Sequence, residues 1–265
     1  MEILGYFLSA LVGISLGLIG SGGSILMVPI LVYVFVLNPV LATSYSLFVV
    51  GSTSLVGAFN NYRKGLVSIK TALLFGLTSV TTVFITRKLI MPRIPDTLFS
   101  IGNFQVKHDL ATMLLFAILM LMASFAMIRG GSENANTDAN TSSADTVKLL
   151  LFGILVGLTT GFLGAGGGFL IIPALVLILK TPMKKAVGTS LLIIALNSLI
   201  GFTGDLGHIS INWKFLISIS LIAIAGIFIG GALAKKIPGP KLKKSFGWFV
   251  LVMGVYIIIK ELFLT

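Results

Sequence analysis

The stretch "LIGSGGSILMVPIL", from Leu18 to Leu31, places glycine or serine at five consecutive positions inside an otherwise apolar run. A related stretch, "FLGAGGGFLIIPAL", occurs near the middle of the chain, from Phe162 to Leu175. Glycine adopts backbone conformations that other residues avoid and that end a helix. Each cluster therefore predicts a break between two helical segments. We interpret the prolines that follow, Pro29 and Pro173, as helix-start or kink residues.

The composition is that of an integral membrane protein. Of the 265 residues, 56% are hydrophobic and only 10% are charged, whereas a soluble domain has about 25% charged residues. The net charge of +11 comes from short basic clusters between apolar segments, as in the loops of proteins that obey the positive-inside rule. We therefore expect a multi-pass protein of the cell membrane with the lipid bilayer as its surroundings, and no nucleic-acid partner.

The chain has ten apolar segments. The third, fourth and fifth of each half are long enough, or nearly so, to cross ~30 Å of hydrocarbon at about 1.5 Å per residue. The first two of each half are short, and joining them would give a helix of about 50 Å, too long for one straight span. We therefore expect an all-α fold with about eight transmembrane helices plus short helices broken at the glycines. The segments are 3–18, 24–37, 41–59, 70–90, 109–128, 148–163, 169–180, 187–203, 214–234 and 245–263.

The two halves form an internal repeat. At an offset of 144 residues, Leu11–Val32 and Leu155–Val176 agree at 11 of 22 positions, which include five glycines and the proline. We divide the chain into a first membrane repeat, 1–128, a polar linker, 129–147, and a second membrane repeat, 148–265. Inverted and parallel repeats place almost the same number of basic residues on one side, 13 or 12 of 19. We favour inverted repeats, because duplicated transporters with interrupted helices often have one central site between inverted halves.

The glycine breaks are the first candidates for a binding site. A helix that starts inside the bundle presents free backbone N–H groups and a partial positive charge, which together bind anions. Hydroxyl and amide groups on the following spans would add donors. The candidate substrate-binding residues are Gly20, Ser21, Gly22, Gly23, Ser24, Gly164, Ala165, Gly166, Gly167, Gly168, Ser46, Thr189, Ser190 and Asn197.

Small residues also serve helix packing. For Gly13, Gly17, Gly157 and Gly161, spaced four residues apart, packing is the favoured interpretation. The clusters at 20–24 and 164–168 are too dense for a helix seam, and there we favour a functional break.

Three ionisable residues are candidates for an entrance or for coupling. Arg87 lies near the end of an apolar segment beside Lys88, and the first interpretation is an interfacial side chain that extends to the lipid headgroups. Attraction of substrate is the alternative. Asp205 and His208 lie in "GDLGHIS", which is either a plain loop or a site that carries a coupled proton.

The segments with the glycine breaks contain no cation. From Leu4 to Val36 and from Leu149 to Leu179 there is no Lys, Arg or His. A cation at the bilayer centre is costly, so we expect an anion to be held chiefly by neutral donors and helix N-termini.

Four motifs resemble one known family. "GLIGSGGSILMVPIL" and "GFLGAGGGFLIIPAL", together with "AVGTSLLIIALNSLIGF" (186–202) and "HISINW" (208–213), resemble the sulfite exporter TauE/SafE family, which is grouped with related anion permeases as TSUP. The resemblance covers the chain apart from the linker and residues 91–108. It implies transport of small sulfur-containing anions, such as sulfite or organosulfonates, across the cytoplasmic membrane. Ser21 and Ser24 depart from the glycine pattern of the first motif.

The function classes left open are transport and assembly. The sequence has no cysteine, P-loop, zinc-ligand spacing or H-E-x-x-H motif, so we expect no enzyme activity, no cofactor and no metal site. A secondary anion transporter driven by a gradient is the favoured function. A membrane scaffold whose glycines only pack, or a passive anion channel, is the alternative, and a homo-oligomer stays open. A transporter predicts two glycine breaks that meet around a polar interior, and a scaffold predicts breaks that are packed shut.

Overall fold

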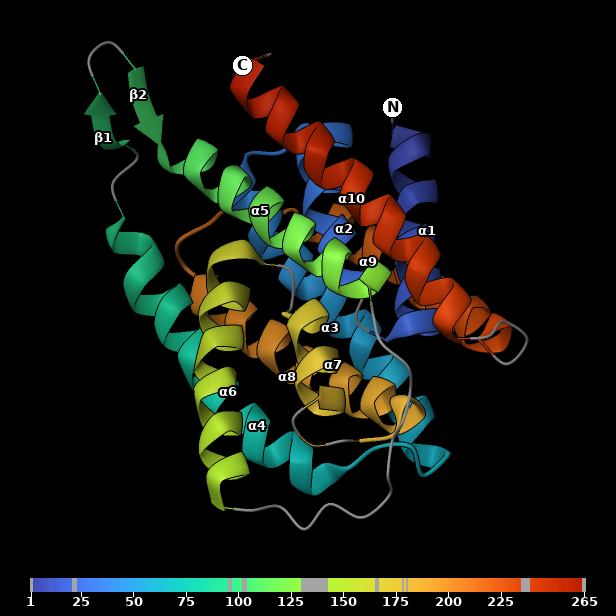
Figure 1. The fold of residues 1–265 in the computed structure, drawn as a ribbon. Helices are drawn as coiled ribbons and strands as arrows, with labels where there is room; N and C mark the ends of the chain where they lie inside the picture. Colours follow the sequence, from blue (N-terminus) through green and yellow to red (C-terminus); the bar gives the residue numbers. More distant parts are fainter. Residues whose placement is uncertain are drawn as a thin grey trace.

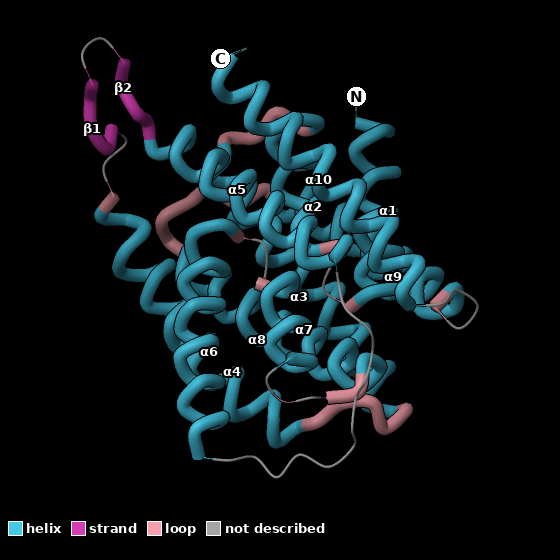
Figure 2. Tube along the Cα trace, viewed as in Figure 1, coloured by secondary structure: helices cyan, strands magenta, loops and turns pink. Residues whose placement is uncertain are grey.

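The computed structural model describes residues 2–20, 23–94, 97–101, 104–129, 143–164, 167–177, 179, 181–234 and 239–263. Helices account for most of these residues (Figure 2). In chain order they are α1 (Glu2–Ile19), α2 (Ser24–Pro29), α3 (Pro39–Arg63), α4 (Ile69–Ile85), α5 (His108–Arg129), α6 (Ser143–Leu163), α7 (Gly168–Leu177), α8 (Met183–Asp205), α9 (Trp213–Leu233) and α10 (Gly239–Phe263).

Two helices continue in a wider helical turn. A π-helical turn, η1 (Ile30–Val34), follows α2, and a second, η2 (Thr86–Ile90), follows α4 and leads into the 3₁₀ turn η3 (Met91–Arg93). Pro29 lies inside the helix where α2 becomes η1. Because proline has no N–H to donate, it favours such a change of hydrogen-bond pattern. The interpretation of Pro29 as a kink residue agrees with this position.

A small hairpin corrects the expectation of a purely helical chain. Strands β1 (Thr97–Ile101) and β2 (Phe104–Lys107) pair antiparallel and project beside α5 at the top left of Figure 1. The strand sequences contain aromatic and β-branched residues that favour strands, apolar and polar residues alternate in β2, and Gly102–Asn103 is a dipeptide common in two-residue hairpin turns. This signal was present in the sequence, but in a segment too short to cross a membrane as a helix.

The helices follow the ten apolar segments. Most boundaries differ by a few residues, because polar residues such as Asn38 and Asn212 cap helices just outside the apolar run. Two helices start well before the predicted segment: α10 begins six residues earlier, at Gly239, and α6 begins at Ser143, inside the predicted linker 129–147. Serine at a helix start followed by Asp145 in the first turn favours the extension of α6. The rest of the linker, 130–142, lies outside the described residues.

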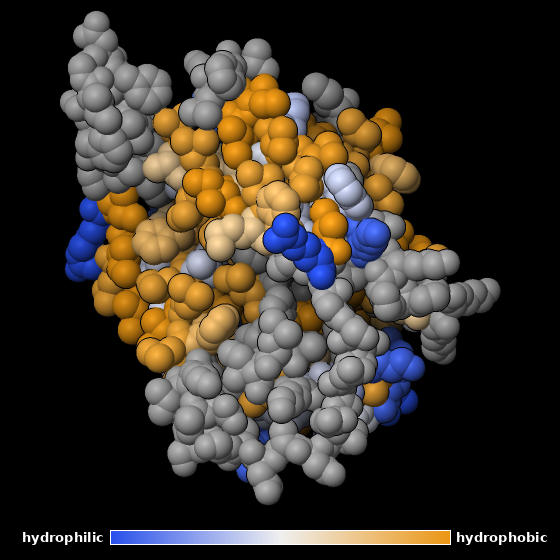
Figure 3. Space-filling view, in the orientation of Figure 1, coloured by the Kyte–Doolittle hydropathy of each residue, from blue (hydrophilic) through white to orange (hydrophobic). Residues whose placement is uncertain are grey.

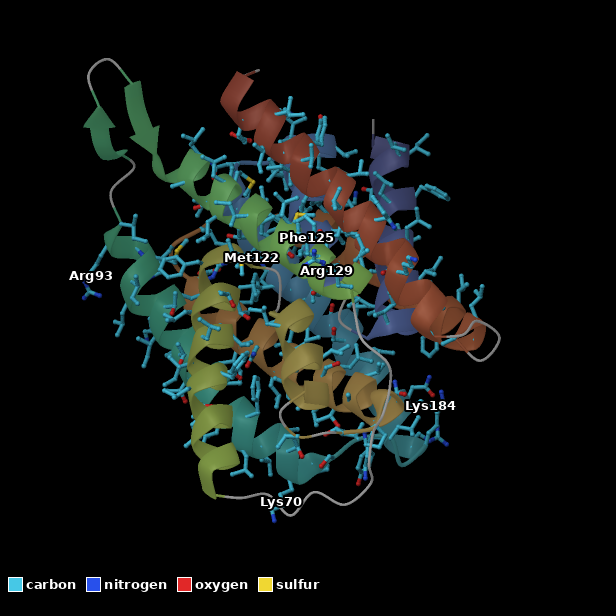
Figure 4. The ribbon with its side chains drawn as sticks, in the orientation of Figure 1. Lys70, Arg93, Met122, Phe125, Arg129 and Lys184 are labelled. Atoms are coloured by element: carbon cyan, nitrogen blue, oxygen red, sulfur yellow. The ribbon has the colours of Figure 1, made fainter. Side chains whose placement is uncertain are left out.

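The surface is suited to a bilayer. Within the described ranges, four helical segments are long and apolar enough to cross a membrane: Pro39–Arg63, Ile69–Arg93, Lys184–Asp205 and Trp213–Leu233. Hydrophobic side chains cover most of the described surface in Figure 3. They include Met122 and Phe125 on α5, which are more than half exposed and point outward in Figure 4. Such a surface is unstable in water and stable in lipid, so this is a membrane protein.

Helices α1 and α9 pack backbone against backbone. A Cβ atom added at Gly13 would overlap the carbonyl oxygen of Ala223, and one at Gly230 would overlap that of Ile14. Gly17 meets the same face of α9 one turn later. The expectation that Gly13 and Gly17 serve packing is therefore confirmed.

Helix α6 packs against α4 in the same manner. A Cβ atom at Gly157 would lie 2.6 Å from the backbone oxygen of Ser79, and one at Gly161 would lie 2.6 Å from Cβ of Thr86. Gly157 and Gly161 thus also serve packing, as predicted.

The centre of the bundle is the antiparallel pair α3 and α8. A Cβ atom at Gly51 would lie 2.9 Å from Cγ of Leu199, and one at Gly57 would lie 3.2 Å from Cδ1 of Leu191. As residue numbers rise along α3, those of the contacted residues on α8 fall, so the helices run in opposite directions. Helices α5 and α10 pack against each other and cross the front of this core (Figure 1).

Two adjacent glycines of α9 provide a test of the α1–α9 contact. Gly230→Ala should lower the free energy of unfolding in detergent by roughly 1–3 kcal/mol, because the methyl group has no room beside Ile14. Gly231→Ala is the matched control, because the nearest atom to its added Cβ is 4.0 Å away. It should be neutral or slightly stabilising. Thermal unfolding of both purified variants measures the difference, and equal midpoints would contradict the packing described.

Candidate functional site

Both predicted glycine breaks are present. Helix α1 ends at Ile19, Gly20 has φ +84°, and α2 starts at Ser24. Helix α6 ends at Leu163, and α7 starts at Gly168 after two left-handed glycines, Gly164 (φ +66°) and Gly167 (φ +63°). These dihedrals favour glycine over any residue with a side chain. Four predicted site residues within the breaks lie outside the described residues: Ser21, Gly22, Ala165 and Gly166.

Each break packs against the first turns of a central helix. A Cβ atom at Gly20 would lie 2.6 Å from Cγ1 of Val187 on α8, and one at Gly164 would lie 2.6 Å from Cα of Thr43 on α3. Gly23 and Gly167 approach the preceding helices α1 and α6 just as closely. Ser24 and Gly168 are buried at the starts of α2 and α7. The described glycines of the breaks therefore have neighbours where a side chain would otherwise lie.

The other predicted donors lie along α3 and α8. Ser46, Thr189, Ser190 and Asn197 are all completely buried. The hydroxyl of Ser190 donates to the carbonyl of Val187 at 2.9 Å. Thr189 Oγ1 accepts a hydrogen bond of 2.9 Å from the backbone N–H of Ser68, so Thr189 fixes the start of α4. The predicted donors thus lie buried on the two central helices, and Thr189 and Ser190 already have protein partners.

Asn197 connects α8 to α4. Its Oδ1 accepts a hydrogen bond of 2.9 Å from Ser79 Oγ, a buried residue that the sequence analysis did not single out. Its Nδ2 donor has no hydrogen-bond partner among the described residues. The amide is therefore held by one atom and has two N–H groups left to donate.

Further buried hydroxyls on the same two helices have no partner. In the described part of the chain, this holds for Ser46, Thr53 and Ser54 on α3 and for Ser198 on α8. Leaving a buried polar group unpaired costs roughly 1–3 kcal/mol, so a group of them indicates a place that binds polar molecules. Sequence reasoning named Ser46 and missed Thr53, Ser54 and Ser198 as site residues. The repeat contained the signal, because Thr53 and Ser54 match Asn197 and Ser198 at the 144-residue offset.

An ion pair lies at one end of the α3–α8 pair. Arg87, in η2, is 1% exposed, and its Nη1 donates to Asp205 Oδ2 at 3.0 Å. Ser44 Oγ on α3 donates to the same carboxylate oxygen and lies 3.3 Å from Arg87 Nη1. Arg87, Asp205 and Ser44 form what we term the ionic cluster, which joins α3, η2 and the end of α8.

The first interpretation of each of these charges is wrong, whereas substrate attraction by Arg87 and a coupled proton at Asp205 stay predictions. Arg87 is not an interfacial side chain, because η2 turns it toward α8, where Gly204 allows close approach (an added Cβ would lie 2.9 Å from Arg87 Cβ). Asp205 is not in a plain loop, because it is the last residue of α8 and is 6% exposed. His208 is exposed in the following turn. The interior thus contains a cation in addition to the neutral donors that we expected.

The comparisons with known proteins identify the family. The model of the family described as sulfite exporter TauE/SafE matches residues 6–257. The chain belongs to this family. The resemblance found in the glycine motifs is therefore confirmed, and TauE/SafE proteins are membrane transporters rather than enzymes.

Several relatives of this TauE/SafE chain have curated names. A probable membrane transporter protein of Xylella fastidiosa (strain Temecula1) is 32% identical over 252 residues, which cover 94% of this chain and 91% of the relative. The probable membrane transporter protein YdhB of Bacillus subtilis is 27% identical over 250 residues, covering 94% and 96%. No solved structure gives a significant match. The relatives agree with the family on transport and name no substrate.

A metal site in this TauE/SafE chain would require several ligating side chains close together in space. Within the described ranges, no three His, Asp or Glu side chains gather in a way that would hold a metal ion. The chemistry available there is hydrogen-bond donation from hydroxyls and one amide, together with one paired charge.

The Ser79–Asn197 hydrogen bond is open to a direct test. Ser79→Ala leaves Asn197 Oδ1 buried without its partner and should lower the free energy of unfolding by roughly 1–3 kcal/mol. Thr81→Ala is the control, because Thr81 is exposed on the same helix and bonds only its own helix backbone. It should change stability by about 0.5 kcal/mol or less. Unfolding in mixed micelles measures both, and equal losses would show that the described contact does not matter.

Proposed function

We propose that this TauE/SafE protein is a secondary transporter of the cell membrane that moves small sulfur-containing anions, such as sulfite or organosulfonates. The main support is the set of buried polar side chains along α3 and α8, in which Ser46, Thr53, Ser54, Ser198 and Asn197 have polar atoms without a hydrogen-bond partner among the described residues. Sulfite has three oxygens that accept hydrogen bonds, and hydroxyl and amide donors suit it. A cation within the membrane is also a candidate for function, because its burial is costly, and Arg87 lies at one end of the α3–α8 pair.

We further propose that the protein consists of two inverted repeats, 1–128 and 148–265, with about eight transmembrane helices. The antiparallel packing of α3 and α8 supports this, because they are equivalent helices at the 144-residue offset. Matching contacts support it as well. The hydrogen bond from the Ser68 N–H to Thr189 has a counterpart from the Asn212 N–H to the Tyr45 hydroxyl. In parallel repeats, equivalent helices would point the same way.

A scaffold without transport activity is the second candidate. The tight contact of the glycine breaks with Val187 and Thr43 favours it, since these glycines have a packing role. The buried donors argue against it, because unpaired hydroxyls lower stability and contribute nothing to assembly. A passive channel would use the same donors as a transporter and differ in its kinetics.

Uptake into liposomes separates the three functions. Purified protein in liposomes should take up sulfite or sulfoacetate with saturable kinetics, and the rate should change when a pH gradient is applied, because a secondary transporter uses the energy of a gradient. Thiosulfate and sulfate serve as comparison anions, and protein-free liposomes serve as the control. Uptake that does not saturate and ignores the gradient would indicate a channel, and no uptake of any of the four anions would favour the scaffold.

Cysteine labelling tests the inverted arrangement. The native chain has no cysteine, so Arg63→Cys and Lys184→Cys each introduce one unique thiol. Inverted repeats place both residues on the same side of the membrane, because the C-terminal end of α3 lies beside the N-terminal end of α8. A membrane-impermeant maleimide should therefore label both from the same side. Labelling from opposite sides would require parallel repeats.

A further inference from the structure

The ionic cluster uses only part of the Arg87 guanidinium. Nη1 contacts Asp205 and Ser44, whereas Nε and Nη2 have no hydrogen-bond partner among the described residues. Nε and Nη2 form one edge of the planar group, and their N–H bonds point in nearly the same direction. Such an edge matches two oxygens on one carbon, sulfur or phosphorus atom. Because the side chain is 1% exposed, bulk water does not satisfy these donors.

Two residues of the ionic cluster lie on the same helices as the buried hydroxyls that have no partner among the described residues. Ser44 is on the same helix as Ser46, Thr53 and Ser54, and Asp205 is on the same helix as Ser198. Lys70 and Arg93 mark the two ends of the α4 segment in Figure 4, and Arg87 is six residues from Arg93. Arg87 therefore lies at the end of the α3–α8 interface that is away from Lys70.

At the other end of the α3–α8 interface, the equivalent positions are occupied by neutral residues. At the 144-residue offset, Ser44, Asp205 and Arg87 correspond to Gly188, Asn61 and Gly231. There, an added Cβ on Gly188 would lie 3.2 Å from Cβ of Asn61, and the Asn61 amide donates to the carbonyl of Gly57 at 2.9 Å. The helices thus pack at that end with neutral groups. A buried ion pair generally stabilises a fold no better than apolar packing does, so packing alone does not explain the charges at the Arg87 end.

We propose that the Nε–Nη2 edge of Arg87 is an oxyanion-binding site, at which a sulfite or sulfonate group accepts two hydrogen bonds while Asp205 and Ser44 hold the opposite side of the guanidinium. This inference rests on the proposed transport function and names a residue that contacts the transported anion. Asp205 is a positioning residue here. Its negative charge orients Arg87 and at the same time repels the incoming anion.

Because of these two effects, the direction in which an Asp205 variant changes anion affinity tests the proposal. Asp205→Asn keeps an oxygen that can accept from Nη1 but removes the negative charge. An anion then meets a full positive charge, so binding should become tighter by about tenfold. A purely structural ion pair predicts the opposite, since its loss would loosen the site. Arg87→Lys keeps the charge but lacks the two-donor edge, and should weaken anion binding by about ten- to hundredfold.

The experiment is a titration of the purified full-length chain in detergent with sulfite and, separately, with sulfoacetate, read by calorimetry. Arg93→Lys is the matched control, because Arg93 is exposed three residues beyond η2 and donates to the carbonyl of Leu89. The anion affinity of this variant should equal that of the wild type. Size-exclusion chromatography and thermal unfolding establish that each variant is folded. If Arg87→Lys does not fold, Asp205→Asn decides the result by its sign.

If the wild type binds an anion and Arg87→Lys binds it with the same affinity, the Arg87 site is wrong and the proposed function still stands. Weaker binding by folded Asp205→Asn also overturns the Arg87 site. A wild-type protein that binds neither anion contradicts the proposed function itself, and the Arg87 site with it.

Discussion

Helices α3 and α8 approach closely because glycines lie where they cross, at Gly51 and Gly57 on one helix and Gly201 on the other. This contact places the polar side chains of both helices inside the bundle, away from lipid. In hydrocarbon, a hydroxyl or amide has no water to bind and must find its partner within the protein. Ser44 and Asp205 meet because of this antiparallel pair, and α4 with η2 adds Ser79 beside Asn197 and Arg87 beside Asp205.

The outer helices keep this arrangement in place through a different kind of contact. On both sides of the core, glycine on one helix meets backbone or threonine on the next, as at Gly230 beside Ile14 and Gly161 beside Thr86. The hydrophobic effect does not drive helices together within lipid, so close van der Waals contact has to do so. The exposed faces of α5 and α10 have no such requirement and contain large apolar side chains instead.

The sequence was sufficient for the helices, the glycine breaks and the family. Hydropathy depends on residues that are neighbours along the chain, and so do helix boundaries. Hydropathy does not separate Arg87 from Lys88, because both are basic residues at the end of an apolar segment, yet Arg87 is buried and Lys88 is exposed. The partner of Arg87 is 118 residues away in sequence, and no local pattern connects them. Likewise, Thr53, Ser54 and Ser198 are ordinary helix residues until the antiparallel pairing of α3 and α8 is known.

The charged and uncharged ends of the α3–α8 interface have a kinetic consequence. To separate the helices at the end with Arg87 and Asp205, an ion pair in a medium of low dielectric constant must be broken, which costs several kcal/mol or more unless another group compensates. At the end with Gly188 and Asn61, only neutral contacts are lost. Under the proposed transport function, opening at the charged end and opening at the neutral end then have different activation barriers.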